Sequence, residues 1–165
     1  MVDLVFCTIC CYILQSECWL TPYTGKTYDL ARRVHRHNHP SNRSRAYTKG
    51  KGPWRVAAAV FGLRSNRQSV WLERALKRHA RHRARPAGLS AVQSAVLDAV
   101  RVASTPRLWW REDTGEGQSP PPLHVHVFRC ALASWPMAEV DLEAPIQAAV
   151  AATAPQVSCH HQRDF

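Results

Sequence analysis

The sequence predicts a small α/β (α+β) domain in which a three-stranded mixed sheet is flanked by helices. Three segments, 4–15, 23–27 and 54–61, are rich in β-branched, aromatic and small apolar residues, as strands are. After the second and third of them, apolar residues recur at helical spacing. With 165 residues, of which 45% are hydrophobic, the chain is long enough for one core of ordinary size and a tail.

Local signals place the helices. The first helix follows the second strand, with Asp29 or Thr27 as its cap, and ends near His39, because the residue before a proline avoids helical geometry. A second helix is expected from Ser65 to about residue 83, since Gln68 stands three residues after Ser65 as in a capping box. A third helix should follow residue 90. The segment 54–61 is almost entirely apolar, which predicts a central strand.

The character of the chain changes after residue 104. Prolines recur, and residues 114–122 combine Gly, Ser and three prolines, so no long hydrophobic period continues. Residues 124–133 have the pattern of one short strand. We therefore expect a folded domain over 1–104 and a Pro-rich tail over 105–165 that is at best partly ordered.

The positive charge is concentrated in one segment. Residues 26–85 contain 17 Lys and Arg but only two acids, a formal charge of +15, while the whole chain carries +10. Such a block favours a polyanion as partner, because each neutralised phosphate releases counterions. The alternative is a merely solvated surface, which basic segments often form.

The six cysteines have no recognisable disulfide spacing, which is typical of proteins from reducing compartments. The apolar run 2–14 is too short to span a bilayer and lacks the basic start of a signal peptide. We expect an intracellular protein that does not enter a membrane, in the nucleus if it comes from a eukaryote or a nuclear virus.

A short motif carries the strongest functional signal. Tyr23-Thr24-Gly25 forms a strand end before a helix on which Leu30 and Val34 should face the core. Arg33 and His37 occupy the same stripe, where a purely structural helix would carry apolar residues. An anionic ligand is therefore expected beside this helix.

These residues resemble the GIY-YIG nuclease superfamily. Tyr23-Thr24-Gly25 stands in the place of Tyr-Ile-Gly, Arg33 in that of the helix arginine, and Tyr12 in that of the Tyr of Gly-Ile-Tyr. Three later features look most like the catalytic subunit of the structure-selective branched-DNA endonucleases: Gly52-Pro53-Trp54, Ser65-Asn66 and Glu73. The resemblance covers roughly residues 7–82. It implies an endonuclease that hydrolyses phosphodiester bonds in branched or flapped DNA during repair or recombination.

The resemblance also implies a catalytic cluster. In relatives the two motif tyrosines and a lysine, here Tyr12, Tyr23 and Lys26, lie together. A phenol is a weak base, but nearby cations such as Lys26 and Arg33 favour its ionised form. We expect Tyr23 to accept the proton with Tyr12 in support, although the sequence leaves the choice of tyrosine open. Arg33 would bind the scissile phosphate, and His37 would either contact that phosphate or pack inside.

Glu73 is the candidate metal ligand. A nuclease needs a carboxylate to hold a divalent cation, and one carboxylate completed by water and phosphate oxygens suits Mg²⁺ or Mn²⁺. The alternative is a surface ion pair with Lys77, four residues along the helix. Residues expected to contact the DNA substrate are Gly25, Arg32, Tyr47, Lys49, Lys51 and Trp54, whereas Arg36 should point outward.

Two departures from the family pattern stand out. Cys10-Cys11-Tyr12 replaces Gly-Ile-Tyr, so the close backbone approach that a glycine permits is lost. The histidines and cysteines after residue 123 lack the paired spacing of the RING-like zinc domain found in the branched-DNA subfamily. The docking domain for a scaffold protein is therefore expected to be absent. The competing functions are a non-catalytic nucleic-acid-binding module of the same fold and an RNA-binding protein.

Overall fold

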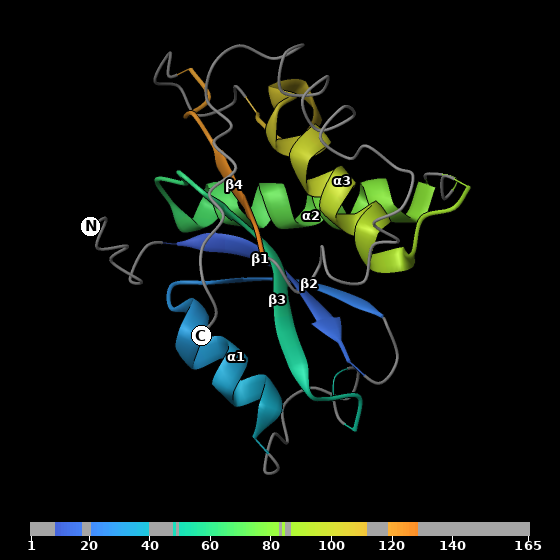
Figure 1. The fold of residues 1–165 in the computed structure, drawn as a ribbon. Coiled ribbons are helices and arrows are strands. Elements are labelled where there is room, and N and C mark those ends of the chain that lie inside the picture. The colour runs from blue at the N-terminus through green and yellow to red at the C-terminus, as the bar shows by residue number, and fades with distance from the viewer. Residues whose placement is uncertain are drawn as a thin grey trace.

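The computed structural model describes residues 9–17, 21–39, 48, 50–82, 84, 87–111 and 119–128. These residues form an α+β fold, as predicted, in which one sheet is accompanied by helices (Figure 1). The strands are β1 (Cys10–Ser16), β2 (Pro22–Thr27), β3 (Trp54–Phe61) and β4 (His124–Val127). The helices are α1 (Leu30–Asn38), α2 (Asn66–His82) and α3 (Ala91–Ala103), followed by a short 3₁₀ turn, η1 (Pro106–Leu108).

The sheet differs from the expected one in two details. It has four strands in the order β2-β1-β3-β4, and all three pairings are antiparallel, so the prediction of a three-stranded mixed sheet is wrong. The strands β2 and β3 do run in the same direction, as a strand–helix–strand connection favours. However, β1 lies between them and is antiparallel to both. The prediction that residues 54–61 form a central strand is confirmed.

Two hydrophobic clusters lie on opposite faces of the sheet. The larger one packs α2 and α3 against one face and includes Cys11 and Ile13 of β1. The smaller one lies on the face covered by α1 and includes Cys10, Tyr12 and Leu14. Figure 1 shows α1 on one side of the sheet, away from α2 and α3. Because β1 is buried on both faces, its side chains alternate between the two clusters.

The helix starts follow the predicted capping signals. The side chain of Asp29 caps α1, accepting a hydrogen bond of 2.9 Å from the backbone N–H of Arg32. At α2, Ser65 Oγ accepts from the N–H of Gln68 at 3.2 Å, whereas the Gln68 side chain accepts from Arg64 rather than from Ser65. The helix positions are therefore determined largely by local sequence.

The segment after residue 104 contributes to the same core. Trp109, Leu123 and Val125 are buried in the larger cluster, and β4 pairs with β3. These residues lie beyond the boundary expected at residue 104, and the short strand expected in 124–133 is present as β4. Residues 112–118 and 129–165 of the expected tail, and the start of the first expected strand, 4–8, lie outside the described residues. No described helix combines the length and apolar character needed to cross a bilayer.

Candidate active site

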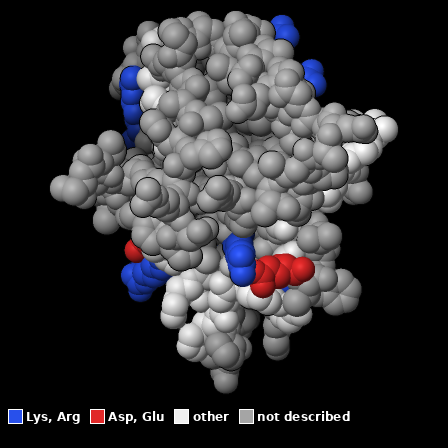
Figure 2. Space-filling view, viewed as in Figure 1, with Lys and Arg blue, Asp and Glu red and all other residues white. Residues whose placement is uncertain are grey.

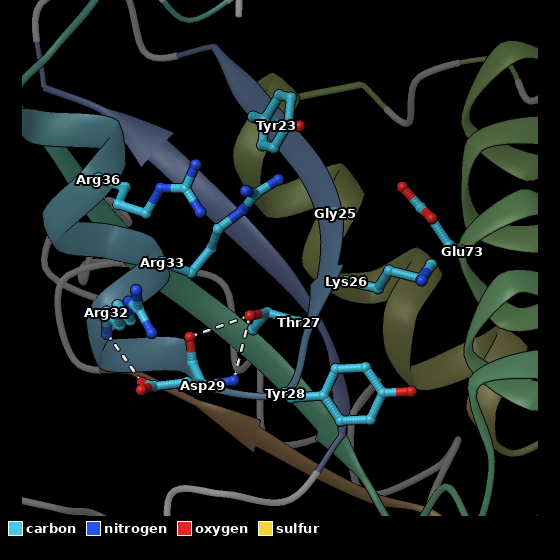
Figure 3. Close-up of a pocket in the computed structure, with 10 residues that line it drawn as sticks. All are labelled: Tyr23, Gly25, Lys26, Thr27, Tyr28, Asp29, Arg32, Arg33, Arg36 and Glu73. Carbon is cyan, nitrogen blue, oxygen red and sulfur yellow. Dashed lines mark hydrogen bonds between the residues drawn. The ribbon is translucent and has the colours of Figure 1, made fainter. Parts of the chain in front are cut away.

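A pocket of about 530 Å³ lies at the edge strand β2. Side chains from β2, α1 and α2 line it. Figure 3 shows the strand between the two helices, with three arginines of α1 on one side and Glu73 of α2 on the other. The pocket is lined by Tyr23, Gly25, Lys26, Thr27, Tyr28, Asp29, Arg32, Arg33, Arg36 and Glu73. Residues distant in the sequence therefore meet at one surface. Six of the lining residues were predicted to be site residues: Tyr23, Gly25, Lys26, Arg32, Arg33 and Glu73.

On the α1 side, a glycine makes room for a buried tyrosine. Tyr12 of β1 is fully buried and stands directly opposite Gly25 of β2. A Cβ atom at Gly25 would lie 2.5 Å from Tyr12 Oη and 2.7 Å from its Cζ, closer than a methyl group can approach without displacement. The glycine of the motif is thus required by the position of the Tyr12 ring, not by an unusual backbone angle.

The hydroxyl of Tyr12 links α1 to the sheet. Arg33 Nε donates to Tyr12 Oη at 2.8 Å, and the same oxygen lies 3.1 Å from His37 Nε2. His37 Nδ1 lies 3.3 Å from Thr48 Oγ1. Because arginine has only donors, the Tyr12 oxygen is the acceptor of the bond from Arg33. Arg33 is thereby held in one orientation by a buried network.

The two motif tyrosines lie on the same face of the sheet, a point that register decides. Tyr12 is opposite Gly25, and Tyr23 is two residues from Gly25, so both rings point toward α1. Their centroids are 6.3 Å apart, and the Tyr23 ring also lies 5.0 Å from His37 and 6.2 Å from Trp54. Tyr23 is only half-buried and lines the pocket, whereas Tyr12 does not reach it.

The α2 side is built from surface pairs. Lys26 points to the opposite face of β2 from Tyr23 and donates to Asn66 Oδ1, the first residue of α2, at 2.7 Å. Glu73 Oε1 accepts from Lys77 Nζ at 2.6 Å, so the alternative foreseen for Glu73 is present. The same carboxylate also lines the pocket. The ion pair and the pocket position are therefore compatible.

Glu73 fits a hard cation as a single ligand. Its side chain is 19% exposed, and among the described residues Lys77 is its only recorded partner, which leaves the second carboxylate oxygen available. The described residues contain no cluster of three or more His, Cys, Asp or Glu side chains that could enclose a metal ion. One carboxylate at an open pocket suits an ion that keeps most of its water, as Mg²⁺ does, and does not suit a closed structural site.

Three arginines of α1 make the pocket basic. Arg32, Arg33 and Arg36 all line it, and Figure 3 shows them on the side of β2 opposite Glu73. The prediction that Arg36 points outward is wrong, because it lies one turn after Arg32 and so shares its side of the helix. Figure 2 shows described Lys and Arg at separate points on the visible face, with acidic side chains beside some of them.

Several predicted DNA contacts lie elsewhere. Trp54 was expected in a DNA-binding loop, but only 1% of it is exposed. As the first residue of β3 it packs beside Tyr23, and its indole N–H donates to the carbonyl of Thr48 at 3.2 Å. A large aromatic ring at the start of a central strand is buried because it packs against the hydrophobic cluster on that face of the sheet. Lys51 is half-buried and is not among the residues lining the pocket, while Tyr47 and Lys49 lie outside the described residues.

His37 was given two alternatives, and its surroundings favour packing. The ring is 6% exposed, and both of its nitrogens lie within hydrogen-bonding distance of Tyr12 and Thr48. It is not among the residues lining the pocket. Its place in the network makes it a support for Tyr12 and, through Tyr12, for Arg33.

The replaced first motif keeps Tyr12 in place. Cys10 and Cys11 are both fully buried free thiols, one on each face of β1. Burial raises the pKa of Cys10 to about 12, and burial, with a smaller contribution from Glu73, raises that of Cys11 even further. The thiols therefore stay protonated and act as small apolar side chains.

Sequence reasoning missed four lining residues: Thr27, Tyr28, Asp29 and Arg36. Thr27 ends β2, and Tyr28 and Asp29 connect it to α1, so these three lie between lining residues of both elements. Thr27 Oγ1 accepts from the N–H of Asp29 at 3.1 Å, so the two residues form a local turn that begins the helix. Thr27, Tyr28 and Asp29 lie between the predicted site residues Lys26 and Arg33 in the sequence, and this position could have identified them as lining residues.

The comparisons agree with this geometry. Residues 8–85 match the family model of the GIY-YIG catalytic domain. No curated protein matches the chain. The matched segment includes both motif tyrosines, Arg33 and Glu73, and thus every element that contributes to the pocket. The GIY-YIG family consists of phosphodiester-hydrolysing nucleases that generally use a divalent metal. Residues 8–85 of this chain are therefore a GIY-YIG catalytic domain, and the enzyme is a nuclease of that type.

Proposed function

We propose that this nuclease cleaves DNA within branched or flapped structures, in repair or recombination. The observation that carries the chemical part of the proposal is a pocket into which a tyrosine, an arginine and a carboxylate converge from β2, α1 and α2. Positive charge surrounds this pocket, and a polyanionic backbone is the ligand that such a surface favours. The preference for branched DNA is supported by the resemblance of Gly52-Pro53-Trp54 and Ser65-Asn66 to that subfamily.

Tyr23 is the proposed general base. Its ring lines the pocket, whereas Tyr12 is fully buried and has its oxygen engaged by Arg33 and His37. A base must approach the proton that it removes to hydrogen-bonding distance, which a buried group cannot do with bulk water. Tyr23, with its oxygen deprotonated, would accept a proton from the attacking water. Tyr12 is then a positioning residue that orients Arg33.

Arg33 is the proposed ligand of the scissile phosphate. Its Nε is used by Tyr12, and within the described part of the chain no partner is recorded for its two terminal amino groups. Figure 3 shows the guanidinium group directed into the pocket beside β2. A fork of donors held in one orientation matches two phosphate oxygens and stabilises their growing charge. Arg32 and Arg36 would contact neighbouring phosphates.

Glu73 is the proposed ligand of the metal, Mg²⁺ or Mn²⁺, across the pocket from Arg33. When bound, such an ion neutralises phosphate oxygens and the leaving oxygen. Lys26, held by Asn66 at the start of α2, would contribute a further positive charge near the substrate strand. In this proposal, cationic groups would lie on both sides of the strand to be cut.

A cleavage panel tests this proposal. Labelled single-stranded, duplex, flap and junction DNA would be incubated with the full chain and Mg²⁺ or Mn²⁺, with structured RNA as a further substrate. We expect metal-dependent cuts near the branch point and no comparable cleavage of plain duplex. Tight binding to all substrates without any cleavage would support the non-catalytic module instead, and a preference for RNA would support the RNA-binding alternative.

A further inference from the structure

One aromatic side chain at the pocket has no evident structural role. Tyr28 follows β2 directly and precedes Asp29, the cap of α1. It is 56% exposed, and it is the one large hydrophobic side chain among the described residues that is exposed to this extent. Exposing an aromatic ring costs free energy that burial would recover. A single exposed ring is nevertheless common and carries no conclusion by itself.

The position of Tyr28 supplies the second observation. The residue lines the same pocket as Lys26, Arg33 and Glu73. Figure 3 shows its side chain extending from the end of β2 to the side on which Lys26 and Glu73 lie. Its neighbours in the pocket are charged, so its ring is an apolar surface at a site otherwise suited to phosphate and metal.

The other tyrosines of the site are held by their neighbours, and Tyr28 is not. Tyr12 and Tyr23 pack against each other and against His37. For Tyr28 the described residues record no hydrogen bond and no ring contact. Its ring is thus free to pair with a ligand, and the flat face of a nucleobase is the part of a nucleic acid that an aromatic ring binds.

We propose that Tyr28 forms a nucleobase subsite, in which its ring stacks on the base of a nucleotide that flanks the scissile phosphate. This inference rests on the proposed function and adds a requirement to it. A base in a duplex is already stacked on both faces, so the base that Tyr28 receives must be unpaired or displaced from its stack. The pocket therefore selects DNA strands that are single-stranded or splayed at the point of cutting.

The first experiment measures binding without metal. The probe is a short, labelled single-stranded oligonucleotide, compared with otherwise identical oligonucleotides carrying one abasic nucleotide at successive positions. Tyr28→Ala should weaken binding of the intact probe on the order of tenfold, because one stacked base is lost. Tyr28→Phe keeps the ring and should bind like the wild type. Tyr28→Leu keeps an apolar side chain without a flat ring and should resemble Tyr28→Ala.

The abasic probes identify the partner of the ring. At one position, removal of the base should weaken the wild type to the level of Tyr28→Ala and should have little further effect on that variant. Equal affinity of wild type and Tyr28→Ala for the intact probe would overturn the inference, as would a loss that persists unchanged on every abasic probe. Thermal unfolding of each variant shows whether the fold is retained, and Tyr28→Phe serves as the conservative control.

A cleavage experiment separates this inference from the proposed function. On flap DNA, Tyr28→Ala should lower kcat/KM on the order of tenfold, and the same abasic substitution should remove the difference from wild type. If the wild type cuts none of the substrates, the proposed function fails while the binding experiment still decides on Tyr28. If the wild type cuts flap DNA and Tyr28→Ala cuts it equally well, the nucleobase subsite alone is refuted.

Discussion

The two sides of the edge strand β2 are built in different ways. On the α1 side, Tyr12 and His37 are buried and join Arg33 to the sheet through hydrogen bonds of 2.8 and 3.1 Å. On the α2 side, the partners that the described residues give to Glu73 and Lys26 are Lys77 and Asn66, both at the surface. Buried networks restrict orientation, whereas exposed pairs contribute little and exchange readily with water.

The two sides should therefore differ in how strongly a substitution affects the stability of the fold. The α1 side positions the groups that we propose bind phosphate and remove a proton, and it is part of a hydrophobic cluster. The α2 side presents a carboxylate whose partner is a solvated lysine, so a cation could replace that lysine at small cost. We therefore expect substitutions on the α1 side to alter stability and activity together, and those on the α2 side to alter activity alone.

The largest effect is expected from Glu73→Gln. The variant keeps the size of the side chain and removes the charge that would hold the ion, so single-turnover cleavage should fall by several orders of magnitude. Stability should change by only a few tenths of a kcal/mol, the usual worth of a surface pair. Lys77→Ala removes the same pair but keeps the carboxylate and should still cleave. Cleavage by Glu73→Gln within tenfold of wild type would exclude the metal role.

Arg33→Ala should reduce cleavage about 100- to 1,000-fold, as loss of a donor to developing charge does. Binding should weaken much less, because other cations of the basic segment still hold the DNA backbone. Arg36 lines the pocket and cannot serve as a control, so the matched variant is Arg107→Ala, which is exposed and lies in η1. Equal loss of affinity and turnover in Arg33→Ala would make Arg33 a general phosphate contact.

Gly25→Ala tests the buried side through packing. The added methyl group would displace the Tyr12 ring, so we expect a loss of about 1–3 kcal/mol in the free energy of unfolding, together with reduced cleavage. Gly50→Ala is the comparison: its φ is +72°, but the methyl group would meet nothing within 4 Å. Backbone strain there should cost about 1 kcal/mol and leave cleavage intact. Denaturant unfolding and cleavage of the two variants would be compared, and unchanged stability of Gly25→Ala would contradict the packing argument.

The smallest expected effect concerns the two thiols of β1. Burial raises the pKa of Cys10 from 9.0 to about 12, so the folded state keeps a proton that the unfolded state loses. The resulting stability is complete below pH 9 and declines above it, by about 1 kcal/mol for each thiol near roughly pH 9.5. Denaturant unfolding between pH 8 and pH 10 should show a shallower decline in Cys10→Ala and in Cys11→Ala than in wild type. Identical slopes in all three proteins would refute this assignment.

Much of the fold could be predicted because its signals are local. The strand at 54–61 follows from its composition, and α1 and α3 follow from the capping residues Asp29 and Ser90. The mixed sheet was a wrong prediction, because strand order depends on contacts between distant segments. The short strand expected within 124–133 is present as β4, but its place in the sheet beside β3 was not predicted, because that pairing joins distant segments.

The candidate site divides in the same way. Tyr23, Arg33 and Glu73 were identified from residue types, helical spacing and the family resemblance, and the pocket brings all three together. The burial of Trp54 and the inclusion of Arg36 were not foreseen. Both depend on how α1 and β3 pack, and helical periodicity locates a stripe of residues without fixing which neighbour covers it.

By itself the sequence determined the α+β class, the helix starts, the basic segment and the motif residues, because composition, capping and spacing act over a few residues. Only the tertiary structure decided the register that opposes Tyr12 to Gly25, the division of the pocket by β2 and the exposure of Tyr28 at its rim. A shift of one residue in that register would move Tyr12 to the other face of the sheet. Such choices are made by packing between segments far apart in the chain.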